Sequence, residues 1–262
     1  MESKPLKRAM CGTIGVAAML LSGASYAVGT WETTLLGRDI NGSAVAASST
    51  SAVFLYDTTL DVTWLRDANM NGAVYWDTAN LWANGLVVGA YSGWRLPTMI
   101  DTGAPGCDFS TAGGTDCGYN VLTKSGDPTQ HEAGQVVYSE MAHLFYLALG
   151  NKAYCPPGDA TCSGPGVPQP GYGLTNTGDF QNFQSGVYWL GLPHASRPDF
   201  EAWLLATSTG VQIYELRDVP HFAMAVRAGD VFAVPEPTIY GLMLAGLGVV
   251  VAATRRRNGG VL

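Results

Sequence analysis

Cysteine is the residue with the clearest chemistry in this chain. Four cysteines lie in two close pairs, Cys107 with Cys117 and Cys155 with Cys162. Four cysteines allow three pairings, and pairing within each short, Gly-rich loop is favoured because short closures form most easily. A zinc site is the alternative, although its usual spacing has about two to four intervening residues. We therefore predict two local disulfides.

Other residues that could form a catalytic or metal site are scattered. The four histidines show neither His-x3-His nor His-Glu-x-x-His spacing, which a metal hydrolase would need. Gly-x-Ser-x-Gly, Walker and Gly-x-Gly-x-x-Gly motifs are absent from the sequence. The loop acids lack the Asp-x-Asp-x-Asp-Gly pattern of a calcium loop; they are Asp108, Asp116, Asp127 and Asp159. We predict no catalytic residue, no cofactor and no metal.

Tryptophan offers a second kind of site, a platform for stacking sugars. Six tryptophans lie in periodic apolar runs, and Trp is a large core residue whose N–H needs only one partner. We therefore predict core positions for Trp64, Trp76, Trp82, Trp94, Trp189 and Trp203. Arg95 is expected to hold the turn in SGWRLPT through a buried hydrogen-bond network. Turn or cap roles are expected for Asp57, Asp61 and Asp67.

Two helices and several antiparallel strands would position these residues. Apolar residues at helical spacing predict a first helix over 75–86. A second helix should begin after Ser139, a suitable N-cap, and end at Gly150, a natural C′ residue. β-rich runs between turns predict strands at 53–56, 62–65, 187–190, 202–206, 211–216 and 222–227. Residues 28–52 show no sustained period and are expected to be an irregular lead-in.

The N-terminus has the composition of a signal peptide. Lys4, Lys7 and Arg8 precede an apolar stretch over 9–21, and small and polar residues follow up to Ala27. A positive segment, an apolar segment and a small-x-small end are the parts of a secretory signal. We predict that residues 1–27 are removed by cleavage between Ala27 and Val28. Export to an oxidising compartment in turn favours disulfides over zinc.

The C-terminus carries three parts in a fixed order. The triplet Pro235-Glu236-Pro237 precedes an uncharged apolar run over 238–254, and Arg255-Arg256-Arg257 follow. As a helix, the run would measure roughly 25 Å, near the lower limit for a hydrocarbon core of about 30 Å. The arginines would stay cytoplasmic, and the prolines would keep the triplet extended. Residues 234–257 resemble the PEP-CTERM sorting tail, which implies processing by an exosortase-type membrane protease; an ordinary single-span anchor is the alternative.

The body between the two ends is acidic. The whole chain has 21 acidic and 14 basic residues. Leaving out the ends removes Glu2, Glu236 and six basic residues, so that 28–234 has a net charge of −11. This charge argues against nucleic acid and anionic lipid as partners, since both are themselves negative.

Six segments of the body follow one another in a distinctive order. They are LYDTTLDVTWLRDAN, SGWRLPT, SEMAHLFYLALGN, SGVYWLG, AWLLATSTGVQ and HFAMAVRAGDV. In this order they resemble the Lcl C-terminal domain family, over residues 53–232. The resemblance implies an α+β, C-type-lectin-like domain in which two helices flank antiparallel strands. A transmembrane helix over 238–254 would complete the architecture.

Together these features predict an exported, non-enzymatic surface or extracellular-matrix protein sorted by an exosortase-type system. Its candidate ligand is exopolysaccharide. The precursor is expected to be anchored in the inner membrane by 238–254, and the mature protein to reside at the cell surface or beyond it. The alternative is an extracellular enzyme whose site is assembled from loop residues.

Overall fold

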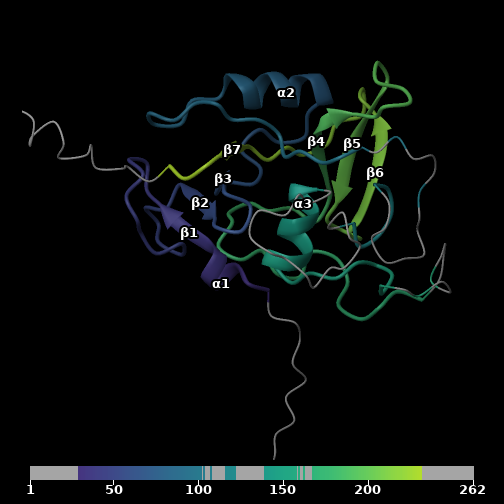
Figure 1. Ribbon diagram of the computed structural model, residues 1–262, viewed down its shortest axis with the longest axis horizontal. Helices are drawn as coiled ribbons and strands as arrows, with labels where there is room; N and C mark the ends of the chain where they lie inside the picture. Colours follow the sequence, from purple (N-terminus) through teal and green to yellow (C-terminus); the bar gives the residue numbers. More distant parts are fainter. Residues whose placement is uncertain are drawn as a thin grey trace, which may run out of the picture.

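The computed structural model describes residues 29–101, 103, 107, 116–121, 139–157, 159, 162 and 167–231. These residues form two antiparallel sheets and a few short helices (Figure 1). In chain order the elements are α1 (Trp31–Thr34), β1 (Leu35–Arg38), β2 (Phe54–Asp57), β3 (Val62–Leu65), α2 (Trp76–Gly85), α3 (Glu140–Ala142), the π-helix η1 (His143–Ala148), β4 (Val187–Pro193), β5 (Glu201–Ala206), β6 (Val211–Leu216) and β7 (Val226–Ala228).

The first sheet has four strands in the order β1-β2-β3-β7. β2 and β3 form the hairpin predicted from the sequence. Within its turn, Asp61 adopts a φ of 52°, a left-handed conformation that Asp tolerates better than most residues. The Asp61 carboxylate accepts a hydrogen bond of 2.8 Å from the Tyr56 hydroxyl. β1 pairs with β2 and lies in the segment predicted to be irregular. The sequence did not indicate this strand because four residues are too few to show a period.

The second sheet has three strands in the order β4-β5-β6, and both of its faces are covered. Side chains alternate along β5, as they must in a strand. Leu204 packs against α2, whereas Trp203 and Leu205 join the main core together with Phe145 of η1. Figure 1 shows α2 along the top of the molecule and α3 between the two sheets. Coverage on both faces explains why every residue of β5 is buried.

Both predicted helices are present, but the second differs in type. α2 buries Trp76, Ala79 and Ala83, the stripe that the sequence shows. The Ser139 hydroxyl caps the second helix by accepting a hydrogen bond of 3.2 Å from the Ala142 amide. After a single α turn, this helix continues as η1, with wider π-type hydrogen bonding. Gly150 follows with a φ of 67°, the conformation expected after a helix end.

The expected α+β, C-type-lectin-like fold is wrong for the described part of the chain, which is mostly β. α2 has 10 residues, while α1, α3 and η1 have 4, 3 and 6. The main core is formed largely between the two sheets, so the helices serve as covers rather than as a separate layer. None of the helices described is long and apolar enough to span a bilayer. The helix expected at 238–254 lies outside the described residues, so the structure gives it no support.

Candidate functional site

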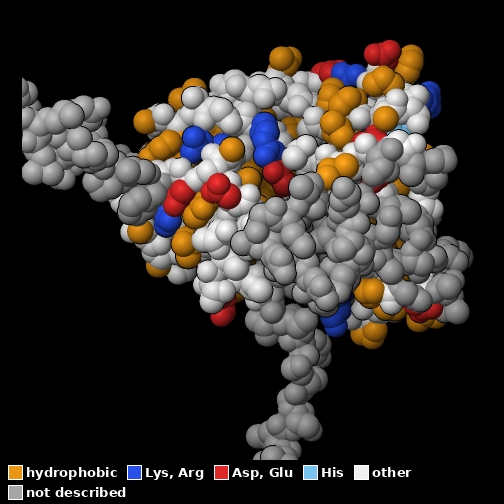
Figure 2. Space-filling view, viewed as in Figure 1, with side chains coloured by type: hydrophobic (Ala, Val, Ile, Leu, Met, Phe, Trp, Pro, Cys, Tyr) orange, Lys and Arg blue, Asp and Glu red, His pale blue; other side chains and the backbone are white. Residues whose placement is uncertain are grey.

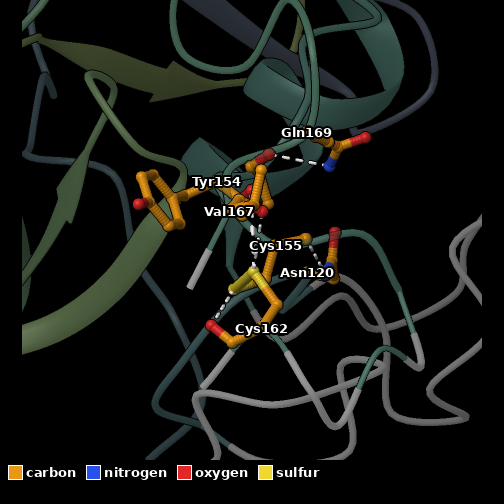
Figure 3. The surroundings of a disulfide bond; sticks show 7 residues. Asn120, Tyr154, Cys155, Cys162, Val167 and Gln169 are labelled. Atoms are coloured by element: carbon orange, nitrogen blue, oxygen red, sulfur yellow. Dashed lines mark hydrogen bonds between the residues drawn. A yellow bond between two sulfur atoms is a disulfide. The ribbon is translucent and has the colours of Figure 1, made fainter. Parts of the chain in front are cut away.

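The structure contains the two disulfides predicted from loop proximity, Cys107–Cys117 and Cys155–Cys162. Figure 3 shows the second bond, which is buried in the loop after η1. The Asn120 side-chain amide donates a hydrogen bond of 3.3 Å to the Cys155 carbonyl. The backbone amide of Gln169 donates one of 3.0 Å to the Tyr154 carbonyl. Each of these four sulfur atoms is part of a disulfide, so none of them is a thiolate that could bind a metal.

Arg95 takes part in a structural ion pair with Glu140. Its two terminal nitrogens each lie 2.7 Å from a carboxylate oxygen of Glu140. Glu140 also accepts a hydrogen bond of 2.7 Å from the Thr98 amide. The hydrogen bonds to Glu140 raise the pKa of Arg95 above its usual value. The network expected to hold the turn is therefore present, and Glu140 is the partner that the sequence did not reveal.

A second polar pair, Asp57 and His143, lies deeper in the core. The Asp57 carboxylate is 3.9 Å from His143 Nε2, and both side chains are almost fully buried. Burial raises the pKa of Asp57 to about 6, although hydrogen bonds from the Leu60 and Thr59 amides act in the opposite direction. Asp57 thus has the turn role predicted for it and, in addition, carries a perturbed carboxyl. Without access to solvent, this pair has no route to a substrate.

Five tryptophans occupy the core positions predicted for them. Their exposed fractions lie between 0% and 9%; they are Trp64, Trp76, Trp94, Trp189 and Trp203. Trp82 is half-buried against the same cores. The Trp76 indole donates a hydrogen bond to the Leu190 carbonyl, and the Trp189 indole donates one to the Val74 carbonyl. These tryptophans therefore stabilise the fold and offer no platform for a sugar.

His194 and Glu201 form a polar cluster at the end of β4 and the start of β5. His194 Nδ1 lies 2.9 Å from a Glu201 carboxylate oxygen, and its ring stacks on Tyr214 with 3.8 Å between centroids. Asp101 accepts hydrogen bonds of 2.8 Å from the Trp203 indole and the Ala195 amide. Desolvation raises the pKa of Asp101, but these bonds and the neighbouring His194 outweigh it and leave the pKa lowered. The cluster fastens the loop between β4 and β5.

An open hollow lies beside this loop, where the first turn of α2 meets the end of β6. It has a volume of about 380 Å³ and is called here the α2–β6 hollow. Its lining includes two aromatic residues, three aspartates and one arginine: Tyr75, Phe200, Asp77, Asp199, Asp218 and Arg217. In Figure 2 this region is at the upper right, where apolar, acidic and basic side chains gather. A concave surface with aromatic and a few polar groups is the usual form of a small-ligand site.

The sequence did not single out this hollow. Tyr75 was expected only as the start of a helix, and Phe200 and Arg217 lay in turns between predicted strands. Those segments are far apart in the chain, so no spacing could connect them. The one local signal is Asp199-Phe200, an exposed aromatic residue beside an acid in a turn.

A metal site finds no support in the part of the chain that the structure describes, which holds no suitable group of three His, Cys, Asp or Glu side chains. Among the loop acids, Asp116 and Asp159 are described, whereas Asp108 and Asp127 lie outside the described residues. The cleavage pair Ala27 and Val28 lies outside them as well. So do the sorting residues 235–237 and 255–257.

Comparisons with known proteins identify one segment of the chain. Residues 233–257 match the PEP-CTERM protein-sorting motif. No curated protein and no solved structure shows significant similarity to the chain, so the resemblance to the Lcl C-terminal domain family and its fold has no support. The motif implies an exported protein that is anchored in the membrane before processing. The chain therefore carries a PEP-CTERM sorting motif in its C-terminal segment, and this motif implies processing by an exosortase.

Proposed function

We propose that the mature protein is a non-enzymatic component of the cell surface or extracellular matrix, held there by exopolysaccharide. The observation that carries this proposal is the sorting motif at 233–257, which follows directly on a folded body. Sorting delivers this body to the outside of the cell, where polysaccharide is the abundant partner. The two disulfides suit a protein that functions in that oxidising environment.

Two of the titratable side chains, Glu140 and His194, are engaged in structural contacts, which supports the non-enzymatic proposal for these two groups. Glu140 is occupied by Arg95 and the Thr98 amide, and His194 is occupied by Glu201. A general acid needs a proton to donate, and a general base an atom that can accept one, within reach of a substrate. These groups instead hold turns and loops of the protein itself.

Sorting can be tested by replacing Pro235, Glu236 and Pro237 together with Ala. In a host that carries an exosortase, the variant should accumulate in the membrane fraction, while the wild type reaches the surface or the medium. An antibody against the body would follow both proteins. Asn258→Ala, just beyond the matched motif, is the control and should be released normally. Release of the triple variant at the wild-type level would show that the triplet is not the processing signal.

Retention and catalysis can be separated with the exopolysaccharide of the same host. The exported protein should sediment with the polysaccharide, and the length of the polysaccharide should stay constant during incubation. Shortening of the chains would favour the alternative, an extracellular enzyme. Failure to sediment would remove the binding role and leave the sorting role intact.

A further inference from the structure

The two aromatic rings at the α2–β6 hollow, those of Tyr75 and Phe200, are the most exposed aromatic side chains among the described residues. Tyr75 is 54% exposed and Phe200 is 61% exposed, whereas the core tryptophans are buried. Leu216, also exposed, lines the same hollow. Large apolar side chains that gather at a concave surface are costly in water and mark a binding site.

The floor of the hollow is fixed by Arg217. Its guanidinium lies over the Trp76 ring, 4.3 Å from the centroid, and donates a hydrogen bond of 2.8 Å to the Pro198 carbonyl. The same group forms an ion pair with Asp77 in the first turn of α2. These contacts join the start of α2, the end of β6 and the loop before β5. A ligand would therefore meet a site that is already formed, which lowers the entropic cost of binding.

Backbone hydrogen bonds hold the two aromatic residues beside this floor. The Arg217 amide donates to the Phe200 carbonyl at 2.8 Å, and the Trp76 amide donates to the Arg217 carbonyl at 3.2 Å. Tyr75 immediately precedes Trp76, and Phe200 immediately precedes β5. The backbone at both residues is thus held next to the sheet and the helix.

The chemistry of the lining matches that of a sugar ring. The C–H face of a pyranose packs on the negative face of an aromatic ring, and its hydroxyls donate hydrogen bonds to carboxylates. The hollow supplies both kinds of group, the rings of Tyr75 and Phe200 and the exposed carboxylates of Asp199 and Asp218. We propose that the α2–β6 hollow binds a pyranose unit of a neutral polysaccharide. The proposal rests on the proposed function and assigns the residues and the sugar class to it.

The negative charge of the hollow favours neutral polysaccharides over acidic ones. Among the lining residues, three aspartates (Asp77, Asp199 and Asp218) accompany one cation, Arg217, which is already paired with Asp77. A second cation, Arg197, lies 5.6 Å from the centroid of the Phe200 ring and is itself paired with Glu201. The body around them is itself acidic. Uronate or sulfate groups would be repelled at this site, whereas neutral hydroxyls would not. Discrimination against acidic polysaccharides is therefore part of the proposal.

Affinity electrophoresis of the exported protein would test the site. The native gels would contain either a neutral glucan, a neutral galactomannan or alginate, a polymer of uronates. We expect retardation by at least one neutral polymer and none by alginate. Tyr75→Ala and Phe200→Ala should each weaken binding to the neutral polymer by about tenfold or more, as truncation of a central aromatic contact does. Tyr172→Ala, an exposed tyrosine outside the hollow, is the matched control and should bind as the wild type does.

The possible results distinguish the proposal for the α2–β6 hollow from the proposed binding of exopolysaccharide by the protein as a whole. If the host exopolysaccharide retains the wild type and both ring variants equally, the hollow is not the site, although the proposed function stands. Stronger retardation by alginate than by the neutral polymers would overturn the sugar class. If neither the test polymers nor the host exopolysaccharide binds the wild type, both the site and the binding role fail. Thermal melting of each variant would show that it is folded, so that a loss of binding can be assigned to the missing ring.

Discussion

Charged side chains have different surroundings in two regions of the body. In the first region, Arg38 of β1 and Glu140 of α3 are buried and each is held in a two-point ion pair; Arg95, the partner of Glu140, bridges to Val226 of the four-stranded sheet. At the α2–β6 hollow, Asp199 and Asp218 are exposed, and Arg217 pairs across the surface with Asp77. Buried pairs are costly to break, whereas exposed pairs contribute little to stability. The first region should therefore govern folding, and the second region is free to serve binding.

The strongest test of this difference is Glu140→Ala. The change leaves the Arg95 guanidinium and the Thr98 amide without their carboxylate partner. We expect a loss of about 2–4 kcal/mol in the free energy of unfolding, less than for a wholly buried pair because Arg95 is partly exposed. Denaturant unfolding would measure it, with the exposed Glu32→Ala as control. A loss no larger than that of the control would remove the contrast between the two regions.

Asp57 should give the folded state a characteristic pH dependence. Its pKa of about 6 is above the ordinary value of 3.8, so the folded state holds this proton more tightly than the unfolded state does. Protonation thus favours folding: the cost of the buried charge is absent below about pH 4 and is complete above about pH 6. This cost amounts to up to about 3 kcal/mol.

Asp57→Asn removes that titration and keeps the oxygen that accepts the turn hydrogen bonds. The difference in free energy of unfolding between variant and wild type should grow from pH 4 to pH 7 in favour of the variant. Asp39→Asn is a matched control, since Asp39 also accepts two backbone amides in a turn. A difference that is constant with pH would show that Asp57 titrates normally in the folded state.

Removal of the Cys155–Cys162 bond should have a moderate effect. The double change Cys155→Ala and Cys162→Ala relaxes a short loop, and we expect the free energy of unfolding to fall by about 2–3 kcal/mol. Thermal or denaturant unfolding would measure the loss. Peptide mapping under non-reducing conditions would first check the pairing, and any link from Cys155 to Cys107 or Cys117 would contradict it.

The smallest effect is expected at the hollow. Tyr75→Ala and Phe200→Ala should each change the free energy of unfolding by less than about 0.5 kcal/mol, because these rings are mostly in water. Denaturant unfolding of the variants made for the binding test would show this. A loss of more than about 1 kcal/mol at either ring would mean that the hollow belongs to the folding core, and the two regions would then not be separable.

The sequence was informative where the structure depends on neighbours along the chain. The hairpin before Leu65, the helix beginning at Trp76, the Ser139 cap and both disulfides all follow from local spacing or local turn chemistry. Burial of the tryptophans follows from their periodic surroundings. The sorting motif is likewise a continuous segment.

Features that join distant segments were missed. The Arg95–Glu140 pair, the Asp57–His143 contact and the α2–β6 hollow arise only when the sheets assemble. The π form of η1 depends on hydrogen bonds that a spacing pattern cannot distinguish from those of an α-helix. The predicted fold class was wrong for a related reason. Correct prediction of single elements does not determine how the sheets and helices are layered.

The end of β7 has a mechanical consequence. Val231, only 1% exposed, is the last described residue, and the sorting motif begins at residue 233. β7 pairs with β3 on one side and with Arg95 on the other, and Asp230 is held by Arg38. A pull exerted through an attached C-terminus would therefore act within a few residues on β7, the end strand of the four-stranded sheet. The tension would be shared by the three-residue pairing of β7 with β3, the single bridge to Arg95 and the Arg38–Asp230 ion pair.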